Sequence, residues 1–128
     1  MKNRRTIRTE IIINMYQLDL LDNNQELLNI ELDEDSKKLF FECVSKIGEV
    51  DLIIENNLQN YSFSRLAILD KAIIRLATYE MKYTDTPHKI IINEAIEITK
   101  KYSDLDDGKQ HKFTNSVLDS ISKGILNG

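Results

Sequence analysis

The sequence predicts an all-α protein, a helical bundle of six or seven helices. Proline occurs once and glycine four times among the 128 residues, and no stretch shows the strict alternation of apolar and polar residues that is typical of a half-buried strand. Apolar residues recur instead every three or four positions along most of the chain, as they do on the buried face of a helix. A chain of this length can bury one substantial core, so we expect a single domain.

Two main helices are expected in the first half. The first covers about 3–21, and its apolar stripe consists of Ile7, Ile11, Met15 and Leu18. Turn-prone residues end it, and a short helix is expected over about 25–29. Asp33 begins an acidic run that supplies an N-cap for a longer helix, which extends to about residue 57. The single cysteine, Cys43, lies among apolar residues of that helix and is expected to be buried.

Three helices are expected in the second half, after a connector over 60–64. Ser64 is a candidate cap for a helix from Arg65 to about residue 83. Thr86 is expected to cap the next helix, which runs to about residue 102, with Pro87 in its first position. A polar loop over 103–108 precedes a last helix over about 109–125. Its inward face consists of Phe113, Val117, Leu118, Ile121 and Ile125.

The charge of the chain is unevenly distributed. The net charge of −4 argues weakly against nucleic-acid binding. Residues 19–55 carry a formal charge of −8 and the rest of the chain +4, and residues 1–8 hold four bases and no acid. A polyanion responds to the local potential, so this pattern suits a protein that binds nucleic acid on one face. No apolar run approaches the length of a membrane span or a signal peptide, and we expect a cytoplasmic protein with no membrane contact.

No catalytic or metal-binding pattern is present. The two histidines lie far apart without other ligands at metal spacing, and the glycines are isolated rather than clustered in a phosphate loop. Glu94 and Glu97 share one helix face, but we favour ion pairing over a carboxylate pair, with Lys101 as the expected partner of Glu97. We therefore expect no enzyme activity, no cofactor and no bound metal.

Basic residues cluster at the starts of the first and last helices. Arg4, Arg5 and Arg8 lie in the first turns of the first helix, where positive charge opposes the helix dipole. With no acid beside them in the sequence, they indicate either an external anion or a frayed basic terminus. The last helix adds Lys109, Lys112 and Asn115, which could reach phosphates or base edges. For Asn115 and the nearby His111, capping or hydrogen bonding between helices is an equal alternative.

Three segments resemble the NusB family of transcription antitermination factors. They are LDKAIIRLATYE at 69–80, TPHKIIINEAIE at 86–97 and HKFTNSVLD at 111–119. The strong resemblance covers about half of the chain, and the basic start adds to it, whereas residues 22–64 match only in helical character. Two positions depart from the family pattern. Lys109 replaces a usual acid, which would make the RNA face more positive, and His88 replaces a common tyrosine.

The resemblance implies a fold and a function. The fold is two packed three-helix subdomains, at about 1–61 and 62–128, within one NusB-like RNA-binding domain. The function is to bind boxA-type single-stranded RNA with NusE (ribosomal protein S10), in an antitermination complex with RNA polymerase that supports ribosomal RNA transcription. The three arginines match the RNA-contacting start of the family. Tyr16 and Glu80 match the surface that holds NusE, although packing is an alternative for the tyrosine.

Two other functions stay open at this point. One is an RNA-binding module related to the N-terminal domain of ribosomal RNA methyltransferases, without catalysis of its own. The other is a helical protein that only associates with itself, because the sequence does not decide between a monomer and a homodimer.

Overall fold

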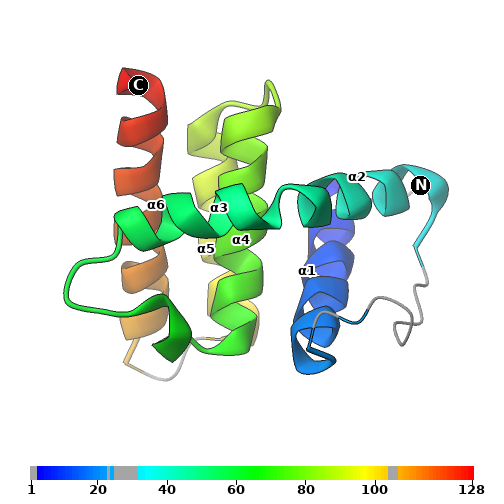
Figure 1. Cartoon of the computed structure of the whole chain (residues 1–128), viewed down its shortest axis with the longest axis horizontal. Helices are drawn as coiled ribbons and strands as arrows, with labels where there is room; N and C mark the ends of the chain where they lie inside the picture. Colours follow the sequence, from blue (N-terminus) through cyan, green and yellow to red (C-terminus); the bar gives the residue numbers. More distant parts are fainter. Residues whose placement is uncertain (1–2, 23, 25–31, 104–106) are drawn as a thin grey trace.

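The computed structural model describes residues 3–22, 24, 32–103 and 107–128, and within them every regular element is helical (Figure 1). The all-α prediction is confirmed. The short helix expected over 25–29 falls outside the described residues. The elements, in chain order, are α1 (Arg4–Leu20), α2 (Glu34–Ser45), α3 (Ile47–Asn56), the short 3₁₀ helix η2 (Phe63–Arg65), α4 (Ile68–Tyr83), α5 (His88–Tyr102) and α6 (Lys109–Asn127).

Helix α4 is the centre of the molecule. It packs against α1, α3, α5 and α6, and Figure 1 shows it upright between α6 and α1, with α2 and α3 crossing in front. Every residue from 72 to 81 is buried, as expected for a helix that is surrounded by others. Polar side chains on this helix therefore need partners inside the protein.

Three buried charged residues on α4 find those partners on different sides. Asp70, Arg75 and Glu80 are each at most 6% exposed and follow one another at intervals of five residues. Since each residue turns a helix by roughly 100°, successive members of this series point about 140° apart. Arg75 forms two hydrogen bonds with Asp51 of α3, at 2.7 and 2.8 Å. Glu80 and Asp70 bind α1 and the α5–α6 connection respectively, as described below.

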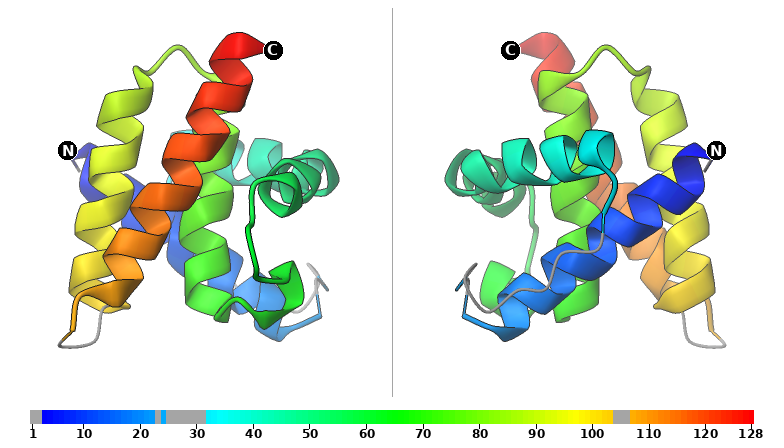
Figure 2. Two further views of the ribbon diagram at one scale, coloured as in Figure 1. Left: turned by 90° about the vertical axis from the view of Figure 1, so that its left-hand side faces the viewer. Right: turned by 90° about the vertical axis from the view of Figure 1, so that its right-hand side faces the viewer.

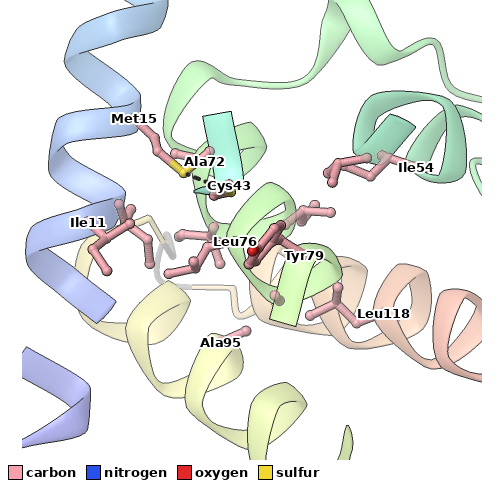
Figure 3. Close-up of a cluster of buried hydrophobic side chains, with 14 of the residues drawn as sticks. Ile11, Met15, Cys43, Ile54, Ala72, Leu76, Tyr79, Ala95 and Leu118 are labelled. Atoms are coloured by element: carbon pink, nitrogen blue, oxygen red, sulfur yellow. Dashed lines mark hydrogen bonds between the residues drawn. The ribbon is translucent and has the colours of Figure 1, made fainter. Parts of the chain in front are cut away.

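One hydrophobic core joins both halves of the chain. Figure 3 shows Ile11 and Met15 of α1, Ile54 of α3 and Leu118 of α6 gathered around α4. Cys43 is buried as expected and lies with its Sγ 3.8 Å from the Sδ of Met15. Burial raises the pKa of this thiol to about 12. The core runs across the boundary expected near residues 61 and 62, and the division into two subdomains stays a prediction.

Helix ends differ from the expected ones in three places. The long helix expected after Asp33 is broken at Lys46 into α2 and α3. Ser45 lies next to the break, and its hydroxyl donates to the Glu42 carbonyl of the helix backbone at 2.6 Å. The Asp33 cap itself is confirmed, because its Oδ1 accepts a hydrogen bond from the Ser36 N–H at 2.9 Å.

The other two differences concern α4 and α5. Helix α4 begins at Ile68, because residues 63–65 form the separate turn η2, and no side chain caps it. Helix α5 begins at His88 with Pro87 as its N-cap, and the Pro87 carbonyl accepts from the N–H groups of Ile90 and Ile91. The prediction that Thr86 caps α5 was therefore wrong by one residue. Pro87 is the N-cap instead of the first helical residue, with the extended ψ of 135° that is typical of a cap.

Candidate nucleic-acid interface

The three arginines at the start of α1 lie in different environments. Asn3 caps this helix by accepting a hydrogen bond from the Thr6 N–H at 2.8 Å, and the first turn contains no acid. Arg4 and Arg5 are exposed, whereas Arg8 is only 7% exposed. The structure thus separates a group that the sequence presented as a single cluster.

Arg8 is bound to Glu80 of the central helix. Its Nε donates to Oε1 and its Nη2 to Oε2, both at 2.8 Å, and Glu80 is only 5% exposed. These hydrogen bonds raise the pKa of the Arg8 guanidinium above its ordinary value, against the opposing effect of burial. A planar guanidinium and a carboxylate match in this two-bond geometry. The Arg8 side chain is therefore directed at α4 rather than at solvent.

Arg5 also has an acidic partner, on α5. Its Nε donates to Oε2 of Glu94 at 2.6 Å and its Nη2 to Oε1 at 3.3 Å. Hydrogen bonding from Arg5 lowers the pKa of Glu94 below its ordinary value of 4.5, although partial burial opposes the shift. The expectation that these arginines lack acids was wrong for Arg5 and Arg8, because the acids come from helices distant in the sequence. Glu97 also has a different partner from the expected Lys101, because its Oε1 lies 3.6 Å from the Nζ of Lys100.

The start of α6 presents its basic residues to solvent. Gly108 precedes the helix with a φ of 69°, a conformation that other residues rarely adopt. Lys109 is 84% exposed, with its Nζ 3.7 Å from Oδ2 of Asp107. Lys112 and Asn115 are both exposed, and their spacing of three places them on one helix face. Their side chains are free to meet a ligand from outside.

A basic groove runs between α1 and α5. It has a volume of about 510 Å³, and its charged lining residues are Arg5, Glu10, Glu97, Lys100 and Lys101. Bases thus outnumber acids by three to two. Lys100 and Lys101 were not singled out in the sequence, where Lys101 was considered only as an ion-pair partner. Two adjacent lysines in the last turn of a helix, just before the basic start of the next one, were the available signal.

An apolar groove continues from the basic one. Thr9, Ile98 and Tyr102 line both of them. The apolar groove has a volume of about 470 Å³ and adds Ile12, Ile13, Tyr16, Gln17, Leu20 and Leu69. Tyr16 therefore lines a surface groove, and its role as a partner contact stays a prediction. Glu80 does not line it, because its carboxylate is buried against Arg8, so the structure does not bring the two predicted partner residues together.

The basic helix starts and both grooves lie around α5. Figure 2 shows the start of α1 beside this helix and the start of α6 next to its far end. His88, at the start of α5, joins neighbouring helices. Its Nε2 lies 3.0 Å from the Met81 carbonyl and its Nδ1 2.7 Å from the hydroxyl of Ser122. Since a carbonyl only accepts, we assign the imidazole proton to Nε2.

This arrangement is suited to binding. Within the described part of the chain, no three His, Cys, Asp or Glu side chains are placed to hold a metal ion. None of the described helices is long and apolar enough to span a membrane. The surface combines exposed cations, which attract phosphates, with an adjoining apolar groove, which can bury partner side chains.

Comparison with known proteins gives consistent matches. The model of the NusB family matches residues 3–123. A transcription antitermination protein NusB of Listeria monocytogenes is 38% identical over 125 residues, which cover 93% of this chain and 95% of that protein. NusB of T. maritima has a TM-score of 0.80 at 28% identity, covering 95% of this chain and 92% of that one. A chain in the crystal structure of antitermination factors NusB and NusE in complex with dsRNA has a TM-score of 0.78 at 28% identity, covering 94% and 96%.

Proposed function

We propose, since this chain belongs to the NusB family of transcription antitermination proteins, that it binds boxA-type single-stranded RNA together with NusE (ribosomal protein S10). The complex would join RNA polymerase and support transcription of ribosomal RNA. The family is not one of enzymes, so the work of this protein is binding. The single observation that carries the proposal is the continuity of the basic and apolar grooves along α1 and α5.

The proposed RNA surface begins at Arg4 and Arg5, follows the basic groove past Lys100 and Lys101, and ends at the start of α6. There Lys109 and Lys112 would attract phosphates, and Asn115 would reach phosphates or base edges. Each phosphate contact releases counterions, so binding should weaken steeply as salt rises. The overall charge of −4 does not prevent this, because the acidic excess lies mainly in residues 19–55.

Arg8 has a different place in this proposal. Its guanidinium is occupied by Glu80, so we assign it the task of holding α1 against α4. Arg4 and Arg5 then project from a helix whose position is fixed. Glu80 is assigned the same task, instead of a contact with the partner.

The proposed partner surface is the apolar groove around Tyr16. An aromatic ring with a polar hydroxyl, beside exposed apolar side chains, is typical of an interface anchor. A related structure contains NusB and NusE together with RNA, which supports NusE as the occupant. RNA and partner would then meet near Tyr102, which lines both grooves.

A titration with and without the partner tests both surfaces. A boxA-type oligonucleotide, single-stranded or in a duplex, is added to the protein at two salt concentrations, alone and with NusE. We expect tighter binding of the single strand, a salt dependence that indicates several phosphate contacts, and a gain in affinity with NusE. Tyr16→Ala should remove that gain and leave the affinity for RNA alone unchanged. Equal binding of an unrelated sequence would contradict the boxA assignment.

The same variant addresses self-association. If light scattering shows a dimer that Tyr16→Ala converts to a monomer, the apolar groove joins two copies of the chain. That outcome, without any gain of RNA affinity from NusE, would overturn the partner assignment and leave the RNA surface in place.

A further inference from the structure

A single buried carboxylate connects the two ends of the α5–α6 connection. Asp70, in the first turn of α4, is 3% exposed. Its Oδ1 accepts a hydrogen bond from the Ser103 hydroxyl at 2.5 Å, and its Oδ2 accepts one from Nε2 of Gln110 at 2.6 Å. Ser103 is the C-cap of α5, and Gln110 lies in the first turn of α6. The carboxylate therefore fixes where α5 ends and where α6 begins.

The residues next to these hydrogen bonds belong to the proposed binding surfaces. Gln110 is flanked by Lys109 and is followed two positions later by Lys112. On the other side, Leu69 precedes Asp70 and Tyr102 precedes Ser103, and both of these apolar residues line the apolar groove. A shift of the Asp70–Ser103 bond would thus move a wall of the groove, and a shift of the Asp70–Gln110 bond would move the basic start of α6.

We propose that Asp70 is a positioning residue that sets the start of α6 for RNA and connects it to the wall of the apolar groove. The inference rests on the proposed function, because it takes Lys109 and Lys112 as RNA contacts. Both oxygens of the carboxylate are used as acceptors, and an amide has only one. Asp70→Asn therefore keeps the shape of the side chain, removes its charge and leaves a single acceptor oxygen, so the charge-assisted hydrogen bonds that hold the two segments are lost or weakened. It should loosen the start of α6 without leaving a cavity.

A double-mutant cycle with Lys112 tests this role. RNA affinity is measured at low salt for the parent, Lys112→Ala, Asp70→Asn and the double variant. In the parent we expect Lys112→Ala to weaken binding about threefold or more, as for the loss of one phosphate contact. In the Asp70→Asn background the same change should cost less than about twofold, because the lysine is no longer held in place.

Asp51→Asn is the matched control. It removes one carboxylate oxygen from the part-buried pair that Asp51 forms with Arg75 on the opposite side of α4, and should destabilise the fold without touching the α5–α6 connection. Lys112→Ala should keep its full effect in that background. If Lys112→Ala costs the same factor in the Asp70→Asn background as in the parent, Asp70 does not position the lysine and the inference is wrong.

Hydrogen exchange gives a second readout that does not depend on RNA. The amides of Phe113 and Thr114 bond to the carbonyls four residues earlier, in the first turn of α6. They should exchange about tenfold faster in Asp70→Asn than in Asp51→Asn. Unchanged exchange overturns the positioning role, whatever the RNA result. A parent protein that fails to bind RNA overturns the proposed function, even if exchange responds as expected.

Discussion

At the start of α1, two of three arginines are held by carboxylates of other helices, whereas at the start of α6 the lysines extend into solvent. Arg8 is bound by Glu80 and Arg5 by Glu94. Lys109 and Lys112 are exposed, and the Nζ of Lys109 lies 3.7 Å from Oδ2 of Asp107 in the adjacent loop. Both helix starts look alike in the sequence, since each has several bases and no acid in its first turn.

The difference shows what a basic helix start does and does not indicate. Positive charge there costs energy against the helix dipole, and that cost can be offset inside the protein as well as by a ligand. Arginine, with its planar two-bond geometry, suits the internal pairs, and lysine, with a mobile and strongly hydrated ammonium group, suits an exposed site. The start of α1 therefore combines anchoring with binding, while the start of α6 is available for binding alone.

Arg8→Ala should produce the largest effect, and it should be on stability. Removal of one partner leaves the Glu80 carboxylate buried without compensation, which costs about 3 kcal/mol or more. Urea unfolding of the variant and the parent measures this. Replacing both partners, as in Arg8→Met with Glu80→Leu, should recover most of the loss. A variant with unchanged unfolding but weaker RNA binding would make Arg8 an RNA contact and would break the comparison.

Lys109→Asp should have the next largest effect, and it should be on RNA. The reversal of charge should weaken RNA binding more than Lys109→Ala does, while an acid in the first turn of α6 favours the helix dipole. Thermal unfolding should therefore not become easier, although affinity falls. RNA titrations at two salt concentrations, paired with thermal midpoints, provide the measurement. If both variants bind RNA as the parent does, α6 does not face the RNA.

Arg5→Ala should reveal a smaller effect that depends on pH. The pKa of Glu94 is lowered in the folded state, so its stabilising contribution is present above the ordinary value of 4.5 and is lost as pH falls through the folded-state pKa. The variant should therefore lack that part of the acid sensitivity of the parent in unfolding titrations between neutral and acidic pH. Arg4→Ala, with no ion-pair partner among the described residues, should keep it. Identical acid sensitivity in all three proteins would show that the Arg5–Glu94 pair is not formed in solution.

Thr86→Ala should have the smallest effect. The Thr86 side chain caps no helix, so the change should alter the free energy of unfolding by less than about 0.5 kcal/mol and leave RNA affinity unchanged. The Thr86→Ala variant serves as the control for the substitutions at the charged helix starts. A loss near 1 kcal/mol, typical of a missing N-cap, would mean that α5 begins one residue earlier in solution.

Local patterns predicted most of the helices but not the contacts between them. The apolar stripe of α1 and the Asp33 cap depend on residues within a few positions of one another, and both are confirmed. The Arg8–Glu80 pair joins residues 72 positions apart, and no pattern among neighbouring residues predicts it. One signal was available. Arg8 precedes Ile11 and Ile12 by three and four residues, which places it on the buried face of α1.

The positions of the predicted site residues were anticipated unevenly for the same reason, and their roles stay predictions. Lys109, Lys112 and Asn115 are exposed on α6 as the pattern required, because the opposite face carries the apolar residues. Lys100 and Lys101 became candidates only when packing placed them across a groove from Arg5. In the sequence, three charged residues interrupt an apolar stripe, namely Asp70, Arg75 and Glu80. Their positions on a helix that is surrounded on all sides explain why they are there.

The buried thiol of Cys43 can report on the separation of α2 from α1. It is the single cysteine of the chain, and with a pKa raised to about 12 it offers almost no thiolate at neutral pH, the form with which thiol reagents react. A thiol reagent can modify Cys43 only after α2 separates from α1 and water reaches the sulfur. The rate of labelling therefore measures how often these two helices part. A cysteine introduced on an exposed face would react first, so fluorescent probes can be attached there without removing the natural residue.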